Sequence, residues 1–337
     1  MTKAYKSGPQ FFAKGTSAVV PMANMMDTLP TRNRREMQFD RANDIDGARI
    51  IESFETRGGG MHNCLTGCVV QCSNVVHGPD GSYLTSALEF ETIALMGSNC
   101  CIGDLDAIAR MDRLCDELGL DTIETGGAMA VAMDSGQLPF GDAEAVIRTL
   151  EGVDKGQELS RAIANGVVST CKTFNVARIP AIKGQGLPAW EPRTLKASGI
   201  TYVTGPMGAD HTAGLVVMPA PDLARASQDS QIVNAVCDSS GFCQFMQPTL
   251  EDMRRFFNLM YGLNLTEEDI VNYGWQCLQD EWEFNRRAGL DDSFPEWLVT
   301  EPVPTNGAVF DVPRDEIRRV FTKMEITPQL LQLPPSG

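Results

Sequence analysis

The sequence predicts a mainly α-helical protein with two multihelical domains. Apolar residues recur with a period of about 3.6 residues in many segments, whereas the alternation that is typical of strands is scarce. The chain has 337 residues, 43% of them hydrophobic and 21% charged, so it is long enough for two cores and too apolar for a disordered protein. Pro180, Gly184 and Gly186 interrupt the helical pattern, and we therefore expect one domain at residues 1–180 and another at residues 181–337.

The first expected elements precede the clearest helix. Residues 1 to about 55 are rich in turn formers, which indicates an extended segment, and the sequence Gly-Pro-Asp-Gly at residues 78–81 predicts a turn. The clearest helix follows these elements. Asp104 is its candidate N-cap and Gly119 its candidate C-terminal glycine, and the apolar residues between them keep the helical period.

Helical patterns then continue through the rest of the chain. A helix of small residues is expected at residues 122–134, where Gly126 and Gly127 let a neighbouring element approach closely. Further helices are expected at residues 142–151, 157–173, 221–236, 249–260, 266–286 and 314–324.

Charge and composition exclude several classes of protein. A formal net charge of −16 repels nucleic-acid backbones, and we interpret the basic run at residues 32–35 as a solvated loop. No apolar run approaches the ~20 residues that cross a bilayer. Residues 1–10 lack a secretory signal, so we expect a cytoplasmic protein without nucleic-acid or membrane partners. In such a chain, ten cysteines favour metal binding over disulfides.

Three cysteines lie close together in the sequence, at Cys64, Cys68 and Cys72. Their spacing lets the three thiols converge on one soft metal centre, whether the segment is a helix or a loop. An iron–sulfur cubane and a structural zinc site each need four ligands, so a distant residue must supply the fourth. Zinc, or three unrelated buried cysteines, is the alternative to a cluster.

A short motif occurs twice, at residues 116–121 and at residues 238–243. Each copy has an aspartate, a glycine three residues later, an apolar residue, and then an acid or a thiol. A carboxylate beside a glycine turn can accept two parallel N–H bonds from a pterin or a guanine. An ordinary helix C-terminus with a glycine cap has the same pattern. Because Cys243 ends the second copy, we expect it to be the missing cluster ligand.

These motifs together resemble the aldehyde:ferredoxin oxidoreductase family. The resemblance covers nearly the whole chain and also includes three further segments in the same order, at residues 88–92, 208–211 and 284–289. It implies two multihelical domains, the second and third of that family, without its β-rich N-terminal base domain. Two details depart from the family pattern: the first cysteine interval is one residue longer, and Phe242 replaces the usual leucine.

The resemblance implies two pterins that chelate tungsten or molybdenum, together with a [4Fe–4S] cluster. The residues that match the pterin-binding positions are Asp116, Leu120 and Asp121 in the first copy and Asp238, Phe242 and Cys243 in the second. The residues that match the cluster ligands are Cys64, Cys68, Cys72 and Cys243.

The implied reaction is the oxidation of a small aldehyde to a carboxylic acid, with electrons leaving through the cluster to ferredoxin or a ferredoxin-like acceptor. Either Glu89 or Glu91 matches the carboxylate near the metal and accepts a proton from the attacking water. His211 matches the nearby imidazole, which hydrogen-bonds the substrate oxygen or carries a proton. The i, i+2 spacing directs the two glutamates differently, so at most one faces the metal. The alternatives are a solvated helix face for the glutamates and a loop histidine in water for His211.

The resemblance also implies a partner, because it does not extend to the base domain. That partner is a polypeptide that carries the base domain, or a further copy in a homo-oligomer. The alternative function is a non-catalytic iron–sulfur electron-transfer subunit that acts beside a separate base-domain polypeptide. The segments at residues 183–184 and 190–193 also fit the family pattern, but the sequence assigns them no role.

Overall fold

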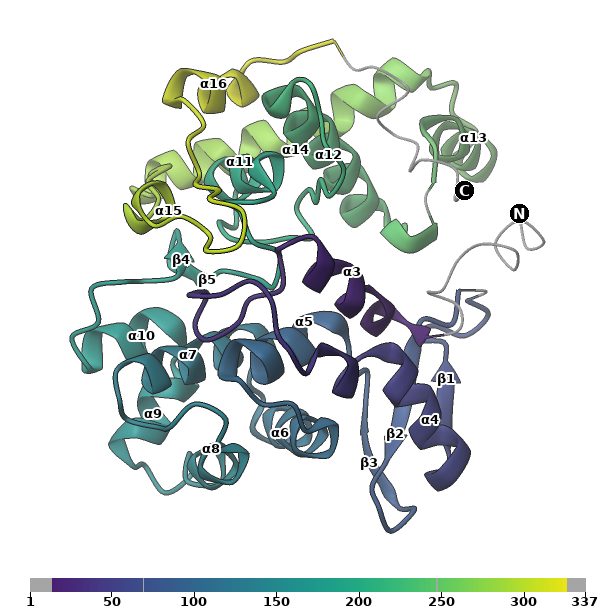
Figure 1. Ribbon diagram of the computed structural model, residues 1–337. Coiled ribbons are helices and arrows are strands. Elements are labelled where there is room, and N and C mark those ends of the chain that lie inside the picture. The colour runs from purple at the N-terminus through teal and green to yellow at the C-terminus, as the bar shows by residue number, and fades with distance from the viewer. Residues whose placement is uncertain (1–13, 69, 247, 326–337) are drawn as a thin grey trace. The chain divides into compact units, whose positions relative to one another are not determined.

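The computed structural model describes residues 14–68, 70–246 and 248–325 (Figure 1). Our expectation for residues 1–10 therefore lies outside the described residues. The described part is mainly helical with little sheet, which confirms the predicted fold class. Within it, no helix combines the length and the apolar character needed to span a bilayer.

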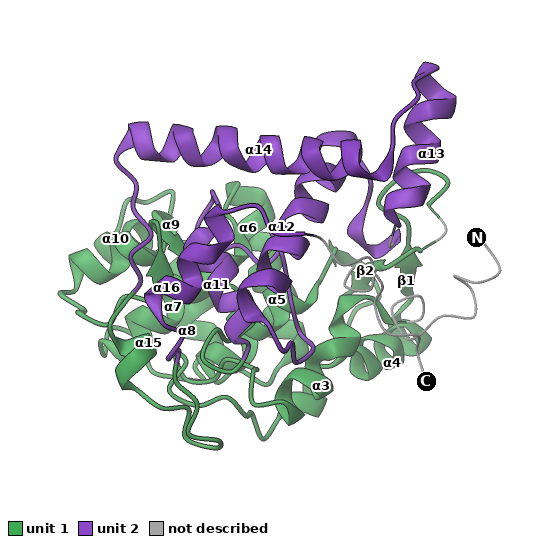
Figure 2. Cartoon of the chain, turned by 90° about the horizontal axis from the view of Figure 1, so that it is seen from above, with its two compact units in different colours: residues 1–194, 295–309 green, residues 195–294, 310–337 purple. Residues whose placement is uncertain are grey.

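The chain forms two compact units, coloured separately in Figure 2. Unit 1 comprises residues 1–194 and 295–309, and unit 2 comprises residues 195–294 and 310–337. The division into domains at residues 1–180 and 181–337 stays a prediction.

Unit 1 begins with short helices, so the expected extended segment is wrong for the described residues up to about 55. They form η1 (Thr16–Val19), α3 (Val20–Met25), η2 (Ala42–Asp44) and α4 (Gly47–Arg57). At the start of α4 the carboxylate of Asp46 accepts a hydrogen bond from the backbone N–H of Arg49, at 2.9 Å. The turn formers in this region therefore separate helices instead of extending the chain.

A three-stranded antiparallel sheet follows, in the order β1 (Gly59–His62), β2 (Ser73–His77) and β3 (Tyr83–Ser86). The predicted turn joins β2 to β3, where the carboxylate of Asp80 accepts hydrogen bonds from the backbone and hydroxyl of Ser82. The longer loop at residues 63–72 joins β1 to β2 and carries the cysteine triad.

The centre of unit 1 is a group of packed helices. A continuous helical stretch consists of α5 (Phe90–Thr92), the π-helical η3 (Ile93–Gly97) and η4 (Ser98–Cys100). The predicted helices follow as α6 (Leu105–Leu118) and α7 (Thr122–Asp134), which confirms their expected positions. A Cβ atom at Gly126 would lie 2.8 Å from the backbone of Leu95, so α7 does need its small residues for close packing against η3.

The helix expected at residues 142–151 is present as α8 (Ala143–Leu150). The single helix expected at residues 157–173 is wrong, because the chain forms two helices there. The two helices are α9 (Glu158–Ala164) and α10 (Gly166–Thr173). Gly166 has a φ of 86°, which breaks the helix, and the Glu124 carboxylate accepts the backbone N–H of Val167 at 2.9 Å. The contact with α7 therefore decides where α10 starts.

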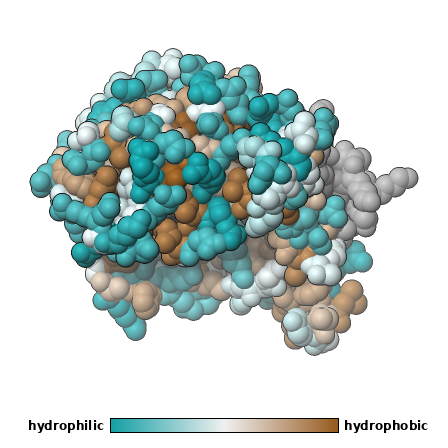
Figure 3. Space-filling view, turned by 90° about the horizontal axis from the view of Figure 1, so that it is seen from below, coloured by the Kyte–Doolittle hydropathy of each residue, from teal (hydrophilic) through white to brown (hydrophobic). Residues whose placement is uncertain are grey.

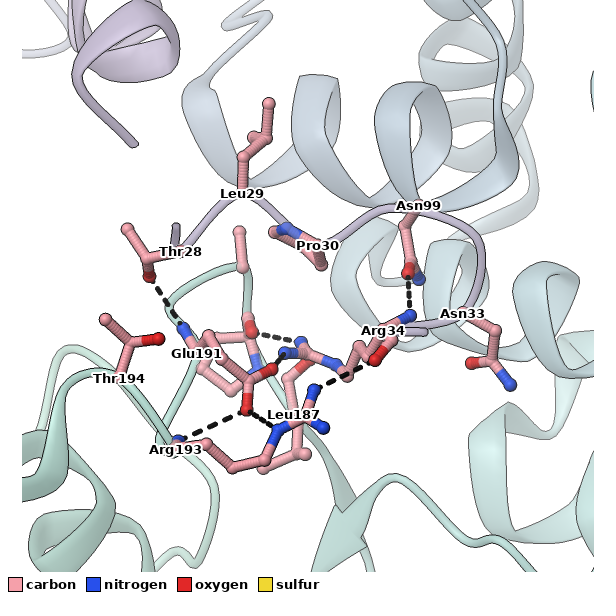
Figure 4. A network of polar contacts seen from close by, with 12 residues as sticks. Thr28, Leu29, Pro30, Asn33, Arg34, Asn99, Leu187, Glu191, Arg193 and Thr194 are labelled. Carbon is pink, nitrogen blue, oxygen red and sulfur yellow. Dashed lines mark hydrogen bonds and ion pairs between the residues drawn. The ribbon is translucent and has the colours of Figure 1, made fainter. Parts of the chain in front are cut away.

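A buried ion network follows the small hairpin of β4 (Ala181–Ile182) and β5 (Gln185–Gly186). Figure 4 shows Glu191 between two arginines. Its carboxylate accepts hydrogen bonds from Arg193 at 2.7 Å and from Arg34 at 3.2 Å, and all three side chains are at most 2% exposed. The interpretation of residues 32–35 as a solvated loop is therefore wrong for Arg34, because its side chain is buried against Glu191, which lies in a distant part of the sequence.

The same network involves the segment of unit 1 that returns at residues 295–309. Arg178 donates to the carboxylate of Glu301 at 2.7 Å, and Arg193 donates to the backbone carbonyl of Glu301 at 3.0 Å. Both guanidinium groups lie over the ring of Trp297, in α15 (Trp297–Thr300), at 3.9 and 5.0 Å from its centroid. The returning segment is thus held to unit 1 by cation–π contacts and hydrogen bonds together.

Unit 2 is built around two long helices, α12 (Leu223–Ser240) and α14 (Glu267–Ala288). A Cβ atom at Gly274 would lie 2.5 Å from the carbonyl oxygen of Ile232, so this glycine permits the close approach of α14 to α12. The expected helices at 221–236, 249–260 and 266–286 are present, although α12 continues to Ser240. The remaining elements are α11 (Lys196–Thr204), which was not expected, η5 (Gln244–Met246), α13 (Leu250–Tyr261), α16 (Arg314–Arg318) and η6 (Arg319–Phe321).

Several large apolar side chains stay exposed near the end of α13. They include Leu259, Met260 and Tyr261. In Figure 3 hydrophobic areas interrupt a predominantly hydrophilic surface.

The helix expected at residues 314–324 is only partly α-helical, since α16 passes into the 3-10 turn η6 at Arg319.

Candidate functional site

The cysteine triad lies in the loop between β1 and β2 in unit 1. Cys64 is exposed, and Cys68 and Cys72 are partly buried. The backbone N–H of Cys68 donates to the carbonyl of Leu65 at 3.0 Å, which makes a turn between the first two cysteines, and Gly67 within that turn has a φ of 86°. The hairpin therefore presents the thiols from one short, partly exposed loop.

All ten cysteines are among the described residues, and all are free thiols. The predicted fourth ligand, Cys243, is exposed and belongs to unit 2. Within residues 14–68, 70–246 and 248–325, no three His, Cys, Asp or Glu side chains are grouped closely enough to hold one metal ion. The four-cysteine ligand set therefore stays a prediction.

The first copy of the repeated motif is the C-terminus of α6. Gly119 adopts the left-handed conformation, and the N–H of Leu120 donates to the carbonyl of Cys115 at 2.8 Å. Asp116 is exposed, and the side chain of Asp121 caps α7 by accepting the N–H of Glu124 at 2.8 Å. The motif thus forms a glycine helix cap that leaves the Asp116 carboxylate at the surface.

The second copy forms the same turn at the end of α12. Gly241 is left-handed, and the N–H of Phe242 donates to the carbonyl of Cys237 at 3.0 Å. The Phe242 ring packs on Phe256 of α13, with 5.0 Å between the ring centroids. Nothing lies within 4 Å of a Cβ atom built at Gly119 or at Gly241, so the surface of both turns is open.

Carboxylates gather around the second turn. Asp238 is exposed at the surface, but partial burial of its carboxyl group, together with the charge of Asp210, raises its pKa. Burial and the charge of Asp238 likewise raise the pKa of Glu281 on α14. Each of these two carboxyl groups therefore takes up a proton more readily than an isolated carboxyl.

Glu89 and Glu91 point to different partners, as their spacing predicts. The Glu89 carboxylate accepts a hydrogen bond from the hydroxyl of Thr16, and burial raises the pKa of Glu89 despite that bond. Glu91 is buried and accepts the backbone N–H of Ala189 at 2.6 Å. The solvated-face alternative is therefore wrong for Glu91, which lies beside the segment held by the buried arginines.

One titratable residue that the sequence did not suggest lies behind the first turn. Asp112 is 3% exposed and is one helical turn before Asp116 on α6. It accepts a hydrogen bond from the Thr85 hydroxyl at 2.5 Å. Burial, with smaller contributions from the charges of Asp116 and Glu89, raises the pKa of Asp112 to about 7. Its position within the apolar pattern of α6 is the only sequence signal of this burial.

His211 lies in a compact loop of unit 2, at residues 208–214, and is partly buried. The carboxylate of Asp210 accepts the N–H of Thr212 at 2.8 Å and lies 3.8 Å from the His211 ring. The side-chain amide of Gln244 donates to the Thr212 carbonyl at 2.8 Å, so the structure brings the His211 loop beside the Cys243 turn. The sequence did not indicate this contact.

The chemical types of these donor groups match those that the implied cofactors use, although the described residues bring no three metal-ligating side chains together. Exposed or partly exposed thiols bind iron and other soft metals. The exposed carboxylates of Asp116 and Asp238 stand beside open glycine turns, where a planar ligand with adjacent N–H groups can approach them. The placement of Glu91 and of the His211 loop adds two groups that can move protons.

Residues 1–324 match the family described as aldehyde ferredoxin oxidoreductase, domains 2 and 3. The chain is 27% identical over 325 residues to a tungsten-containing aldehyde ferredoxin oxidoreductase of Pyrococcus furiosus, and 26% identical over 329 residues to that of Thermococcus kodakarensis. Each match covers 86% of this chain and 53% of the relative, so the chain spans about half the length of these relatives. An aliphatic sulfonate oxidoreductase WOR-like subunit of Pyrococcus furiosus is 27% identical over 231 residues, covering 61% of this chain and 36% of that subunit.

Proposed function

Because the chain belongs to the aldehyde ferredoxin oxidoreductase family, we propose that it takes part in oxidising an aldehyde to a carboxylic acid. An aldehyde and one water yield the acid, two protons and two electrons. We assign the electrons to a [4Fe–4S] cluster and then to ferredoxin or a similar acceptor. The observation that carries the proposal is the pair of matching helix-end turns, each with an exposed aspartate, the second of which ends in the exposed Cys243.

A tungsten- or molybdenum-bis-pterin group supplies the two-electron chemistry when it is bound. The residues proposed to hold the two pterins are Asp116, Leu120 and Asp121 at one turn and Asp238, Phe242 and Cys243 at the other. The residues proposed to hold the cluster are Cys64, Cys68, Cys72 and Cys243. Cys243 serves both groups in this assignment, which keeps electron transfer short.

The remaining residues handle protons and orient the substrate. Glu89 or Glu91 accepts the proton of the attacking water, and the raised pKa of Glu89 makes it a stronger base than an ordinary carboxylate. The Glu91 carboxylate accepts a hydrogen bond from the Ala189 N–H, and this bond fixes the orientation of the Glu91 side chain before the substrate arrives. His211 donates a hydrogen bond to the substrate oxygen or carries a proton away from it.

Replacing Cys243 with serine is expected to remove most of the iron from anaerobically purified protein, because a hydroxyl is a poor ligand for a cubane cluster. Cys277→Ser is the matched control, since Cys277 is a partly exposed thiol of the same unit outside the proposed ligand set. Iron per chain and the visible absorbance report the result. Full iron content in Cys243→Ser would exclude Cys243 as a cluster ligand.

Protein made together with a base-domain partner, in a host that synthesises the metal–pterin group, is expected to reduce a viologen dye when an aldehyde is added, whereas the chain without that partner is expected to be inactive. His211→Ala and Glu91→Gln are expected to lower this rate by about 100-fold or more, as is typical when an acid–base group is lost. The comparison is made at equal iron and tungsten or molybdenum content. Protein that holds iron but no pterin metal and oxidises no aldehyde would instead support the electron-transfer subunit.

A further inference from the structure

The loop that carries His211 is shaped from within by Asp210. This residue is 9% exposed, and its carboxylate accepts hydrogen bonds from both the N–H and the hydroxyl of Thr212, at 2.8 and 2.9 Å. Such a local turn fixes the curvature of the loop. It does not by itself fix the loop against the rest of unit 2.

Two side-chain amides hold the backbone on either side of His211, one just before the loop at residues 208–214 and one within it. Asn285 of α14 donates to the carbonyl of Pro206 at 2.6 Å, and Gln244 of η5 donates to the carbonyl of Thr212 at 2.8 Å. The two donors come from different elements, so together they restrain both the position and the rotation of the segment between them. The exit of the loop also lies close to α12, since a Cβ atom at Gly214 would be 3.0 Å from the N–H nitrogen of Gln231.

These contacts do not serve the core of unit 2. Both amides are only partly buried, and neither residue belongs to the hydrophobic cluster around Ile232 and Trp275. The net contribution of a single such hydrogen bond to stability is small, because it replaces a bond to water and orders a side chain. The effect of the two bonds is therefore on the position of the loop more than on the stability of the unit.

We propose that Gln244 and Asn285 are positioning residues that orient the His211 imidazole toward the substrate oxygen. The proposal rests on the function proposed above for His211. It gives a role to Asn285 in the segment at residues 284–289, and it links His211 to Cys243 through the neighbouring residue Gln244. One side-chain hydrogen bond thereby joins the loop proposed to handle protons to the turn proposed to bind the cluster.

The test uses the paired variant Gln244→Glu and Asn285→Asp, which keeps side-chain size but removes both amide donors. Gln276→Ala is the control, because the Gln276 amide donates to Asp280 at 2.8 Å on the exposed face of α14, in the same unit. The chain has three histidines, so the ring signals of His211 can be assigned by NMR with His211→Ala. The single variants Gln244→Ala and Asn285→Ala provide the same comparison if the pair unfolds.

The ring signals of His211 are expected to move in the paired variant and to stay in place in the control, while both melt near the parent temperature. In the active holoenzyme kcat is expected to fall about tenfold to a hundredfold with KM nearly unchanged. Unchanged ring signals together with an unchanged kcat would overturn the proposal. Moved ring signals in a protein that oxidises no aldehyde would instead keep the positioning role and reject the proposed function.

Discussion

Replacing Glu191 with glutamine is expected to lower the free energy of unfolding by about 3–5 kcal/mol, because it removes the buried carboxylate that both Arg34 and Arg193 bind. Burial by itself would raise the pKa of Glu191, but the charges of Arg193 and Arg34 hold that pKa below its ordinary value. The carboxylate is therefore ionised in the folded protein and cancels much of the buried positive charge. Urea unfolding at neutral pH measures the loss.

The exposed pair of Arg110 and Glu144 is the control for this experiment. It joins α6 to α8 of unit 1, at 3.1 Å, but its side chains are 47% and 62% exposed. Glu144→Gln is expected to change the midpoint little, since water and salt screen such a pair. Similar losses in both variants would show that burial does not set the strength of the Glu191 network.

The network also bears on the candidate site. Arg34 donates to the backbone carbonyls of Leu187 and Pro188, directly before the residue whose N–H binds Glu91. A local loosening in Glu191→Gln is therefore expected to change the surroundings of Glu91 even where the unit stays folded. The segment at residues 190–193, to which the sequence assigned no role, thus supports a candidate catalytic carboxylate.

Replacing Asp229 with asparagine is expected to make the protein more stable at pH 8 by roughly 2–4 kcal/mol and less dependent on pH. Asp229 is 1% exposed, and within the described residues neither carboxylate oxygen has a hydrogen-bond partner. Burial raises its pKa from 3.8 to about 7, an effect that the charge of Arg225 opposes and that of Asp222 increases. The neutral amide avoids the cost of burying a charge at high pH.

The sign of the pH effect follows from the raised pKa. Between about pH 4 and pH 7 the folded chain holds a proton that the unfolded chain has released, so stability falls as pH rises through this window. Asp112→Asn in unit 1 is the comparator, because burial also raises the pKa of Asp112 to about 7. Thermal melts at about pH 5, 6.5 and 8 measure this fall in stability, and each variant is expected to remove part of it. An equally steep fall in Asp229→Asn would contradict a buried, protonated Asp229.

Elements whose signals are local in the sequence were predicted well. The bounds of α6 follow from Asp104 and Gly119, because a cap and its helix lie within a few residues of one another. The repeated motif likewise marked two turns that share one geometry. Its use in binding a cofactor stays a prediction, since the same geometry also serves as a helix cap.

The sequence by itself determined the helical class, the main helix ends and the family, because periodicity, caps and motif order are written in neighbouring residues. Only the tertiary structure decided that Arg34 is buried against Glu191, 157 residues away, and that Gly166 starts a new helix against Glu124. It also placed Gln244 against the His211 loop. A charged or amide side chain has no fixed environment in the sequence, because burial and partner depend on which distant segment the fold brings beside it.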